Sequence, residues 1–242
     1  MMESKNNKSF KNYPNHIALI PDGNRRWAKR KGLSAMFGHE KGAETLEKVL
    51  DKALELKIPY FTFWGLSLDN VLKRPKKEID FIYKIIERQF NKLADDERVH
   101  KNKVKITAIG RYLEYFPATT KEAIEKAINK TKNYSQYRLT FLMAYNGTDE
   151  LVECVKKIQR KGIKSVNEKT IKDNLWTQDL PPVDFIIRTG SENDPHLSAG
   201  FMMWDAAYAQ LYFTETYFPD FGAKEFEKAA LDYAERERRV GK

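Results

Sequence analysis

Three polar segments of the chain follow apolar runs and carry side chains suited to binding phosphate. The first, Asp22-Gly23-Asn24-Arg25-Arg26-Trp27, comes directly after an apolar run at residues 16–20. Arginine forks bind phosphate oxygens in pairs, a glycine lets the backbone approach closely, and a carboxylate can hold Mg²⁺. A helix that starts here would also point N–H groups at an anion. An ordinary Asp-Gly turn with exposed arginines explains the spacing equally well, so the segment needs support from elsewhere.

The other two segments supply that support. Arg188-Thr189-Gly190-Ser191-Glu192 combines an arginine, hydroxyl groups and small residues that can form an anion-binding nest. Gly65-Leu66-Ser67-Leu68-Asp69-Asn70, followed by Lys73-Arg74-Pro75, adds basic donors next to a bulky apolar run. Each segment taken alone is also compatible with a plain loop. Apolar walls that meet basic corners predict a substrate with an apolar tail and an anionic head, such as a prenyl diphosphate.

Strand-like and amphipathic runs alternate from residue 16 onward, and these elements must position the polar segments. Predicted strands cover residues 16–20, 60–66, 104–109, 139–144, 183–187 and 211–214, and predicted helices cover 25–31, 39–57, 76–93, 120–132, 149–161 and 224–239. This order predicts an α/β fold: a single domain with a mostly parallel sheet flanked by helices. Ligands of such sheets bind at the carboxyl ends of the strands, where the three polar segments begin.

The composition predicts one folded domain at residues 16–242, preceded by a flexible polar tail at residues 1–15 that does not read as a signal peptide. A hydrophobic content of 41% is enough for a sizeable core. The single cysteine, Cys154, excludes an internal disulfide, fits a cytoplasmic location, and lies on an apolar stripe that predicts a buried thiol. No run of about 18 apolar residues occurs, so any membrane contact would be peripheral.

The chain is basic, with 43 Lys and Arg against 34 Asp and Glu, a formal net charge of +9. Such a charge suits nucleic acid, an anionic membrane surface or a small polyanionic substrate. We expect no nucleic-acid partner, because zinc-finger spacing, an RNA-recognition signature and a basic recognition helix are missing from the sequence. A P-loop kinase is disfavoured as well, because the Gly-rich loop ending in Lys-Ser/Thr is absent.

The stretch from His16 through Asp22-Gly23-Asn24-Arg25-Arg26-Trp27 to Ala28 resembles the opening motif of the cis-prenyltransferase family, whose best-known members make undecaprenyl diphosphate. Later segments are also similar to the family: Phe37-Gly38-His39, Leu66 to Pro75, Arg188-Thr189-Gly190, and Trp204 to Phe221. The resemblance implies that residues 16–242 form a homodimeric catalytic domain with an apolar substrate tunnel. It also implies a transferase that condenses isopentenyl diphosphate with an allylic prenyl diphosphate in the cis (Z) configuration, giving a polyprenyl diphosphate for a lipid carrier.

The resemblance assigns roles position by position. Asp22 would bind Mg²⁺ and help the allylic diphosphate to leave, and Asn70 would assist removal of a proton from isopentenyl diphosphate. Because an amide is a poor base, we interpret the role of Asn70 as positioning or relay. The implied substrate-binding residues are Gly23, Asn24, Arg25, Arg26, Trp27 and His39 for the allylic diphosphate, and Ser67, Leu68, Asp69, Arg74, Arg188, His196 and Ser198 near the incoming unit.

Some positions depart from the family pattern. Ala35 replaces an arginine that often contacts the allylic diphosphate, with Arg30 or Lys31 available to compensate, and Gln210 replaces a glutamate that helps to hold Mg²⁺. Glutamine coordinates magnesium weakly, so metal binding would rest on Asp22, Asp205, Glu192 or the substrate phosphates. These departures keep a second hypothesis open, a noncatalytic prenyltransferase-like subunit that binds diphosphates. The intact first motif favours the enzyme.

Product length and the preferred allylic primer stay open at this level. Bulky residues of the predicted strands, namely Phe63, Trp64 and Met143, are candidates for the floor of the tunnel.

Overall fold

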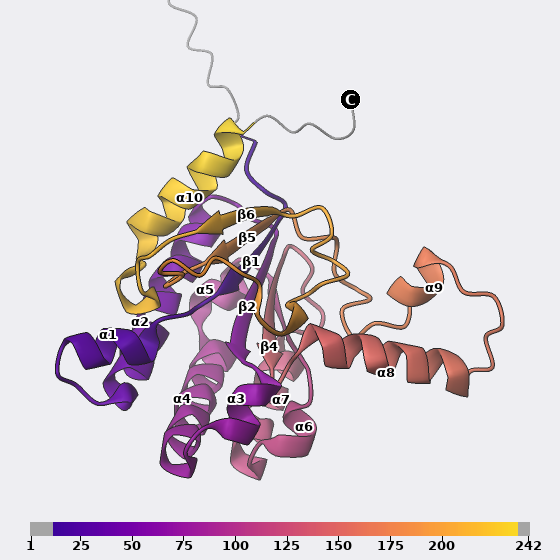
Figure 1. Ribbon diagram of the computed structural model, residues 1–242, viewed down its shortest axis with the longest axis horizontal. Helices are drawn as coiled ribbons and strands as arrows, with labels where there is room; N and C mark the ends of the chain where they lie inside the picture. The colour runs from indigo at the N-terminus through magenta and orange to yellow at the C-terminus, as the bar shows by residue number, and fades with distance from the viewer. Residues whose placement is uncertain (1–11, 237–242) are drawn as a thin grey trace, which may run out of the picture.

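The computed structural model describes residues 12–236, so most of the predicted tail and residues 237–242 lie outside it. Within the described range, six strands form one sheet in the order β3-β4-β2-β1-β5-β6 (Figure 1). Every neighbouring pair is parallel, whereas the sequence predicted a mostly parallel sheet. The strands are β1 (His16–Ile20), β2 (Tyr60–Leu66), β3 (Val104–Ile109), β4 (Tyr137–Met143), β5 (Phe185–Arg188) and β6 (Gln210–Phe213).

Helices cover both faces of this sheet, and the longer ones lie within a few residues of their predicted bounds. They are α1 (Asn24–Arg30), α2 (Ala35–Glu55), α3 (Leu68–Lys73), α4 (Lys76–Asp95), α5 (Glu97–Lys101), α6 (Tyr112–Tyr115), α7 (Ala118–Thr131), α8 (Gly147–Arg160), α9 (Glu168–Lys172) and α10 (Ala223–Glu235). The short 3₁₀ turns are η1 (Ser198–Gly200) and η2 (Phe218–Asp220). Figure 1 shows α8 and α9 projecting away from the sheet. Between residues 12 and 236, no helix has both the length and the apolar content needed to cross a bilayer.

Helix α2 begins earlier than predicted, at Ala35, because glycines let its first turns lie directly against α1. A Cβ added at Gly38 would lie 2.0 Å from the backbone oxygen of Asn24, and one at Gly42 would lie 2.5 Å from the Asn24 side-chain oxygen. Only hydrogen fits at these positions. The polar segment after β1 is therefore held against the start of α2.

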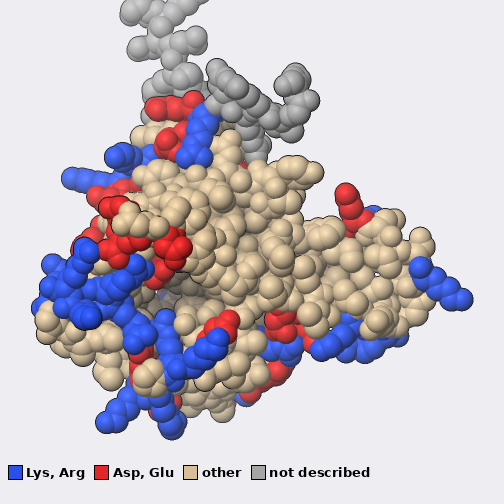
Figure 2. Space-filling model, viewed as in Figure 1, with Lys and Arg blue, Asp and Glu red and all other residues tan. Residues whose placement is uncertain are grey.

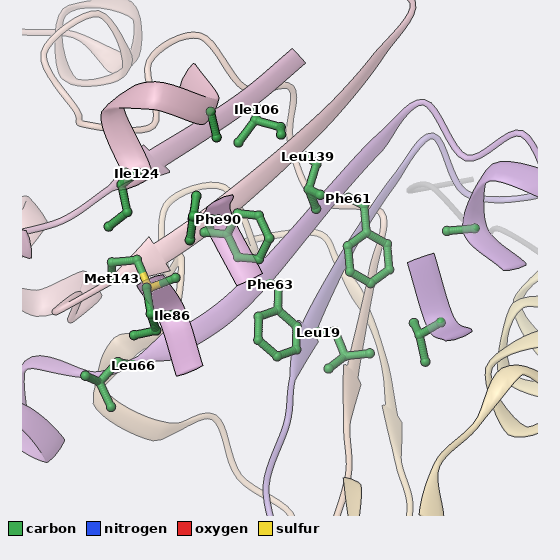
Figure 3. Packing of buried hydrophobic residues seen from close by; sticks show 14 of the residues in the cluster. Leu19, Phe61, Phe63, Leu66, Ile86, Phe90, Ile106, Ile124, Leu139 and Met143 are labelled. Atoms are coloured by element: carbon green, nitrogen blue, oxygen red, sulfur yellow. The ribbon is translucent and has the colours of Figure 1, made fainter. Parts of the chain in front are cut away.

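Side-chain alternation along the strands divides the core into two layers. Ile17 and Leu19 of β1 face α2, α4 and α10, while Ala18 and Ile20 face the segment at residues 176–206. Figure 3 shows the first layer, in which Leu19, Phe63 and Phe90 pack together. This alternation is the two-residue period of a strand that is buried on both faces.

The thiol of Cys154 is buried on α8, as the sequence predicted. It lies beside Ile158 and Leu175, and burial raises its pKa above the ordinary value. Such a thiol is poorly suited to act as a nucleophile.

Helix α10 packs on the sheet partly through Phe226, which is fully buried and meets Phe61 edge to face at 5.8 Å. We expect Phe226→Ala to lower the free energy of unfolding by about 3–5 kcal/mol, because it leaves a cavity where an aromatic ring packed. Urea denaturation followed by circular dichroism measures the loss. Phe37→Ala is the matched control: this ring is 60% exposed, so its removal should change stability by about 0.5 kcal/mol or less. Equal effects of the two substitutions would contradict the role of Phe226.

Candidate active site

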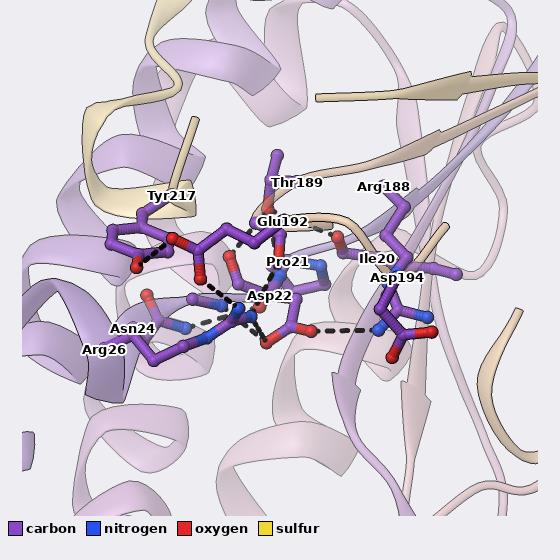
Figure 4. A network of polar contacts seen from close by, with 12 residues as sticks. Ile20, Pro21, Asp22, Asn24, Arg26, Arg188, Thr189, Glu192, Asp194 and Tyr217 are labelled. Carbon is purple, nitrogen blue, oxygen red and sulfur yellow. Dashed lines mark hydrogen bonds and ion pairs between the residues drawn. The ribbon is translucent and has the colours of Figure 1, made fainter. Parts of the chain in front are cut away.

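The loop between β1 and α1 brings the carboxylate of Asp22 between two arginines from neighbouring strand ends. Arg26 Nη2 lies 3.1 Å from Asp22 Oδ1, and Arg188 Nη2 lies 3.1 Å from Asp22 Oδ2 (Figure 4). The N–H of Gly23 donates to Asp22 Oδ1 at 2.6 Å. Gly23 has a φ of 103°, and a Cβ there would lie 2.5 Å from Tyr217, so glycine is required. Two of the predicted phosphate-binding segments thus meet at this carboxylate.

The orientation of Arg26 is set by contacts with the segment that follows β5. Its Nη1 lies 2.8 Å from Glu192 Oε2, and its Nη2 donates to the carbonyl oxygen of Gly190 at 2.7 Å. Arg30 and the hydroxyl of Tyr217 both donate to Glu192 Oε1 at 2.6 Å. The Tyr217 hydrogen bond and the nearby Arg26 hold the pKa of Glu192 below its ordinary value. The Glu192 carboxylate is therefore already paired with Arg26 and Arg30. The sequence did not point to its hydrogen-bond partner Tyr217.

Arg188 links the carboxylate of Asp22 to His196 and Ser198, two further predicted substrate-binding residues. Its Nη1 donates to Ser198 Oγ at 3.0 Å and also to the carbonyl oxygen of His196. His196 Nε2 lies 3.1 Å from the same Oγ, and its Nδ1 lies 2.9 Å from Asp194 Oδ1. The buried Nε of Arg188 has no hydrogen-bond partner among the described residues. The structure thus joins Arg188, His196 and Ser198 in one cluster next to Asp22.

A second basic cluster is built around Glu78, a buried carboxylate on the first turn of α4 that the sequence did not single out. Arg74 Nη1 lies 2.8 Å from Glu78 Oε1, His39 Nε2 donates to the same oxygen at 2.9 Å, and Arg25 Nε lies 3.7 Å away. The four-residue separation of Arg74 and Glu78 across Pro75 was the available signal. Burial alone would raise the pKa of Glu78, but His39 and Arg74 hold it below its ordinary value. Glu78 thus positions Arg25, His39 and Arg74 together.

Asn70 lies on α3, a short helix whose start is fixed by two strand ends. The hydroxyl of Ser67 after β2 accepts the N–H of Asn70 at 3.0 Å. Asn146, which follows β4, accepts the N–H of Leu68 at 3.3 Å and donates to Asp69 Oδ2 at 2.8 Å. Asp69 also pairs with Lys73, and these hydrogen bonds keep the pKa of Asp69 below its ordinary value. Ser67, Leu68 and Asp69 therefore position Asn70, and Asn146 is a further positioning residue that the sequence did not reveal.

These polar clusters stand at one end of a cavity of about 490 Å³. Its polar end is lined by Asp22, Asn24, His39, Asn70, Arg74 and Ser198, and its apolar remainder includes Leu46, Ile82, Ile86, Phe90, Leu93 and Phe141. Figure 2 shows a hollow beside the Lys and Arg side chains that gather over α1. The cavity has the polarity that the sequence predicted for a substrate with an anionic head and an apolar tail.

The predicted floor residues differ in their positions. Phe63 and Met143 pack in the layer that faces the cavity. The indole of Trp64 packs on the other face of the sheet, 5.0 Å from the ring of Phe201, and its N–H donates to the Tyr145 carbonyl oxygen. Successive side chains of a strand point to opposite faces, so Trp64 borders the cavity while its indole packs in the other layer, and its role as a floor residue stays a prediction.

The predicted substrate-binding residue Trp27 packs against Ala28 of α1 and against Tyr217. Its ring is buried, and the indole N–H has no hydrogen-bond partner among the described residues. Lys31 Nζ lies 5.3 Å from the centre of this ring. Trp27 thus supports the wall of the Asp22 loop instead of lining the cavity.

The carboxylate of Asp22 fits a Mg²⁺ ion that takes its other ligands from substrate phosphates and water, as Mg²⁺ commonly does. It is partly exposed at the polar end of the cavity. In the described part of the chain, no three His, Cys, Asp or Glu side chains lie close enough to form a metal site by themselves. Asp205 is wrong as a further ligand, because it is buried in an ion pair with Lys172 and its backbone accepts the Val183 N–H before β5 begins.

A family model described as "Putative undecaprenyl diphosphate synthase" matches residues 20–241. The chain is 35% identical over 235 residues to a tritrans,polycis-undecaprenyl-diphosphate synthase (geranylgeranyl-diphosphate specific) of Thermoplasma acidophilum, covering 95% of this chain and 89% of the relative. The synthase of the same name from Methanocaldococcus jannaschii is 37% identical over 239 residues, covering 96% and 84%. The chain belongs to the undecaprenyl diphosphate synthase family. It is therefore a cis-prenyltransferase.

A solved structure agrees with this family assignment. Lavandulyl diphosphate synthase from Lavandula x intermedia, solved in complex with dimethylallyl diphosphate, superposes with a TM-score of 0.86 and 28% sequence identity. The match covers 95% of this chain and 99% of that one. The fold of this cis-prenyltransferase is thus shared with an enzyme whose bound ligand is an allylic diphosphate.

The departures from the family pattern are also placed by the structure. Gln210 pairs with Phe185 at the beginning of β5 and β6, whereas Asp22 follows the carboxyl end of β1. The Oε1 of Gln210 accepts a hydrogen bond from Arg236 at 3.3 Å. Within one chain of this cis-prenyltransferase, Gln210 is not part of the Asp22 cluster. Arg30, expected to compensate for Ala35, does reach the cluster: its guanidinium pairs with Glu192 and lies 4.7 Å from the centre of the Tyr217 ring.

Burial lowers the pKa of His39 below its ordinary value of 6.5, Arg74 acts in the same direction, and the hydrogen bond to Glu78 opposes them. We expect an NMR titration of the His39 ring to give a midpoint below 6.5. Arg74→Met should raise this midpoint, because it removes a nearby positive charge, and Glu78→Gln should lower it further. The same ring titrated in the urea-unfolded protein provides the reference.

Protonation of His39 is coupled to the stability of the fold. Because the folded-state pKa of His39 lies below that of the unfolded chain, its contribution to stability is complete above pH 6.5 and is lost as the pH falls through the folded value. A midpoint at or above the unfolded reference would contradict the buried, neutral imidazole.

Proposed function

We propose that this protein is a Mg²⁺-dependent cis-prenyltransferase that condenses isopentenyl diphosphate with an allylic prenyl diphosphate in the cis (Z) configuration and releases a polyprenyl diphosphate. The observation that carries the proposal is the convergence of Arg26 and Arg188 on Asp22, which lines the polar end of an apolar cavity. A diphosphate bound there would place its prenyl tail in the apolar part.

Departure of the allylic diphosphate needs groups that stabilise developing negative charge. When the allylic C–O bond breaks, its electron pair goes to the diphosphate oxygen, and Arg25 and Arg26 are placed to stabilise that charge. Asp22 would hold Mg²⁺, which when bound neutralises phosphate charge. The apolar wall beyond the cluster excludes water from the allylic carbon, which becomes electron-poor in the same step.

The incoming isopentenyl diphosphate needs a second anion site close to the first. Arg188, Ser198 and His196 form one side of it, and Arg74 stands on the other side of the cavity mouth. A new carbon–carbon bond then forms to the allylic carbon, and a proton leaves the isopentenyl unit. Asn70 is suited to orient the isopentenyl unit so that diphosphate oxygens accept the proton, because an amide is itself a poor base.

The physiological product is proposed to be a polyprenyl diphosphate that serves as a lipid carrier precursor. The similar synthases named above are described as geranylgeranyl-diphosphate specific, so geranylgeranyl diphosphate is the first primer to test. A cytoplasmic protein with peripheral membrane contact through its lipid product fits an enzyme of this kind.

The second hypothesis is a noncatalytic subunit that binds diphosphates without turnover. It is motivated by Gln210 and Ala35 and opposed by the complete cluster around Asp22.

We expect the purified protein to elongate geranylgeranyl, farnesyl or geranyl diphosphate with labelled isopentenyl diphosphate in the presence of Mg²⁺. Asp22→Ala should lower the rate on the order of 10²–10³-fold, because it removes a group that acts on the developing charge. Thin-layer separation of the dephosphorylated products measures both rate and length. Lys84→Ala, on the exposed side of α4, is the matched control and should retain full activity.

Stabilisation of the protein by these diphosphates without any product would instead support the noncatalytic subunit. Undiminished turnover by Asp22→Ala would contradict the role of that carboxylate.

We also propose a homodimer, and the surface around the edge strand β6 is its expected interface. Tyr208 is 91% exposed, and Met203 and Leu211 are exposed close to it in the chain. Strand β6 has a neighbour on one side only within the described residues. Apolar side chains gathered beside an unpaired strand edge are typical of surfaces that a second copy covers.

Tyr208→Asp should convert the dimer to a monomer at micromolar protein concentration, because burying an unpaired carboxylate in an apolar interface is costly. Analytical ultracentrifugation measures the mass of the wild type and the variant. Tyr115→Asp is the control and should remain dimeric. This exposed tyrosine lies on α6, which follows β3, the edge strand opposite to β6. A wild-type protein that sediments as a monomer would overturn the proposed dimer.

A further inference from the structure

Two apolar side chains next to α1 are left uncovered by the fold. Leu33 is 40% exposed in the turn before α2, and Phe37 is 60% exposed in the first turn of that helix. Leu33 precedes the N-cap Ser34, and a residue in that place often packs against the side chain at the fourth helical position. Here the fourth position is Gly38, where the close approach of α1 permits only glycine. The contact between α1 and α2 therefore leaves Leu33 without this packing partner.

The segment that carries these two side chains is strongly basic. Residues 23–38 contain five Arg and Lys and no Asp or Glu. Lys29 and Lys31 are exposed, and no carboxylate among the described residues pairs with either of them. Lys31 lies instead over the ring of Trp27. Lysines without a carboxylate partner thus stand beside exposed apolar side chains.

A second exposed segment has the same character. Leu72 of α3 is 60% exposed, and residues 71–77 contain four Arg and Lys and no Asp or Glu. The two segments are joined at Glu78, whose Oε1 lies 2.8 Å from Arg74 Nη1 and 3.7 Å from Arg25 Nε. They therefore lie side by side in the fold, although they are far apart in the sequence.

The opening of the substrate cavity lies between these two segments. Asn24, the first residue of α1, and Asn70 of α3 both line its polar end. Figure 2 shows Lys and Arg side chains on both sides of the hollow, over α1 and over α3. Exposed basic and apolar side chains thus surround the opening of a cavity whose interior is apolar.

An anionic lipid bilayer matches this combination of side chains. Its interface accepts apolar side chains among the acyl chains, while lysines extend their charge to the level of the phosphates. The negative surface potential of such a bilayer attracts the lysines. A nucleic acid would pair with the lysines but would offer nothing to Leu33, Phe37 and Leu72. A protein partner would need acidic and apolar groups matched to both segments across the opening.

We propose that the exposed side chains around the opening form a docking surface for a bilayer that contains anionic lipids. The docking surface consists of Lys29, Lys31, Leu33, Phe37 and Leu72. The inference rests on the proposed function in one respect, because it names the compartment that takes up the apolar product. The cavity then opens toward the acyl chains, so a prenyl chain passes into the bilayer with less exposure to water. The docking itself requires no turnover.

The wild type should sediment with vesicles of equal parts phosphatidylcholine and phosphatidylglycerol, and bind phosphatidylcholine vesicles about tenfold more weakly. The double variant Leu33→Ser with Phe37→Ser, and separately Lys29→Glu, should each weaken binding to the anionic vesicles about fivefold or more. Val166→Ser and Lys164→Glu are the matched controls and should bind like the wild type. Both of these residues are exposed between α8 and α9, which project away from the sheet (Figure 1).

Three results would overturn the docking surface. The first is a wild type that binds neither kind of vesicle, which would favour a protein partner for these side chains. The second is equal binding to both kinds of vesicle, which would exclude recognition of anionic lipid. The third is unchanged binding by the double variant, which would place the contact elsewhere on the protein.

A dye at residue 37 reports the contact directly. Cys154 is the only cysteine of the chain and is buried, so a polarity-sensitive thiol dye attaches to Phe37→Cys at residue 37. Its emission should move to shorter wavelength when anionic vesicles are added, and the same dye on Val166→Cys should not respond. A dye at residue 37 that stays in water while the protein sediments with vesicles would overturn the docking surface. Both measurements need no substrate, so absence of elongation by the wild type would contradict the proposed function alone.

Discussion

The site depends on carboxylates that lie between its arginines. Several arginines lie close together before any diphosphate binds, and the carboxylates offset the repulsion between their positive charges. Asp22 lies between Arg26 and Arg188, and Glu78 holds Arg74 and Arg25. Each guanidinium is oriented by an anion that belongs to the protein, so less side-chain freedom is lost when substrate binds. The same arrangement keeps the basic residues from repelling one another in the free protein.

The two carboxylates differ in what surrounds them, and this separates their roles. Glu78 is buried under an imidazole and two guanidinium groups, so it is committed to positioning. Asp22 is partly exposed toward the cavity, so its Oδ1, which pairs with the half-exposed Arg26, can meet a metal ion while Oδ2 keeps the buried Arg188 paired. The chemistry of the site follows from this difference in exposure as much as from residue type.

Beyond the polar edge, the architecture separates a rigid wall from a weaker one. The strands and α7 form a layer packed through fully buried side chains such as Ile106 and Ile124. Helices α2 and α4 stand apart around the apolar cavity and are joined on the outside by exposed ion pairs. Close-packed interiors resist changes of volume, so the sheet with α7 is the stiffer of the two sides.

The sequence by itself determined the strands, the longer helices and most of the phosphate-binding residues, because these depend on local patterns. Apolar runs that lead into Asp22-Gly23 or Arg188-Thr189 indicate where strands end. The carboxyl ends of neighbouring parallel strands lie on the same side of the sheet. Tertiary structure alone decided which side chains meet. Glu78 and Asn146 come from segments with no phosphate signature, yet they position Arg74 and α3 through contacts that only folding creates.

The face on which a side chain lies was decided in the same way. Phe63 and Trp64 look alike as candidates for a tunnel floor, but the pleat sends them to opposite sides of the sheet. By residue type Asp205 is a further candidate ligand for a metal ion, but Asp205, like Gln210, lies on the side of the sheet where the strands begin. Residue type and spacing specify what a side chain can do, whereas its distance from Asp22 is a property of the folded chain.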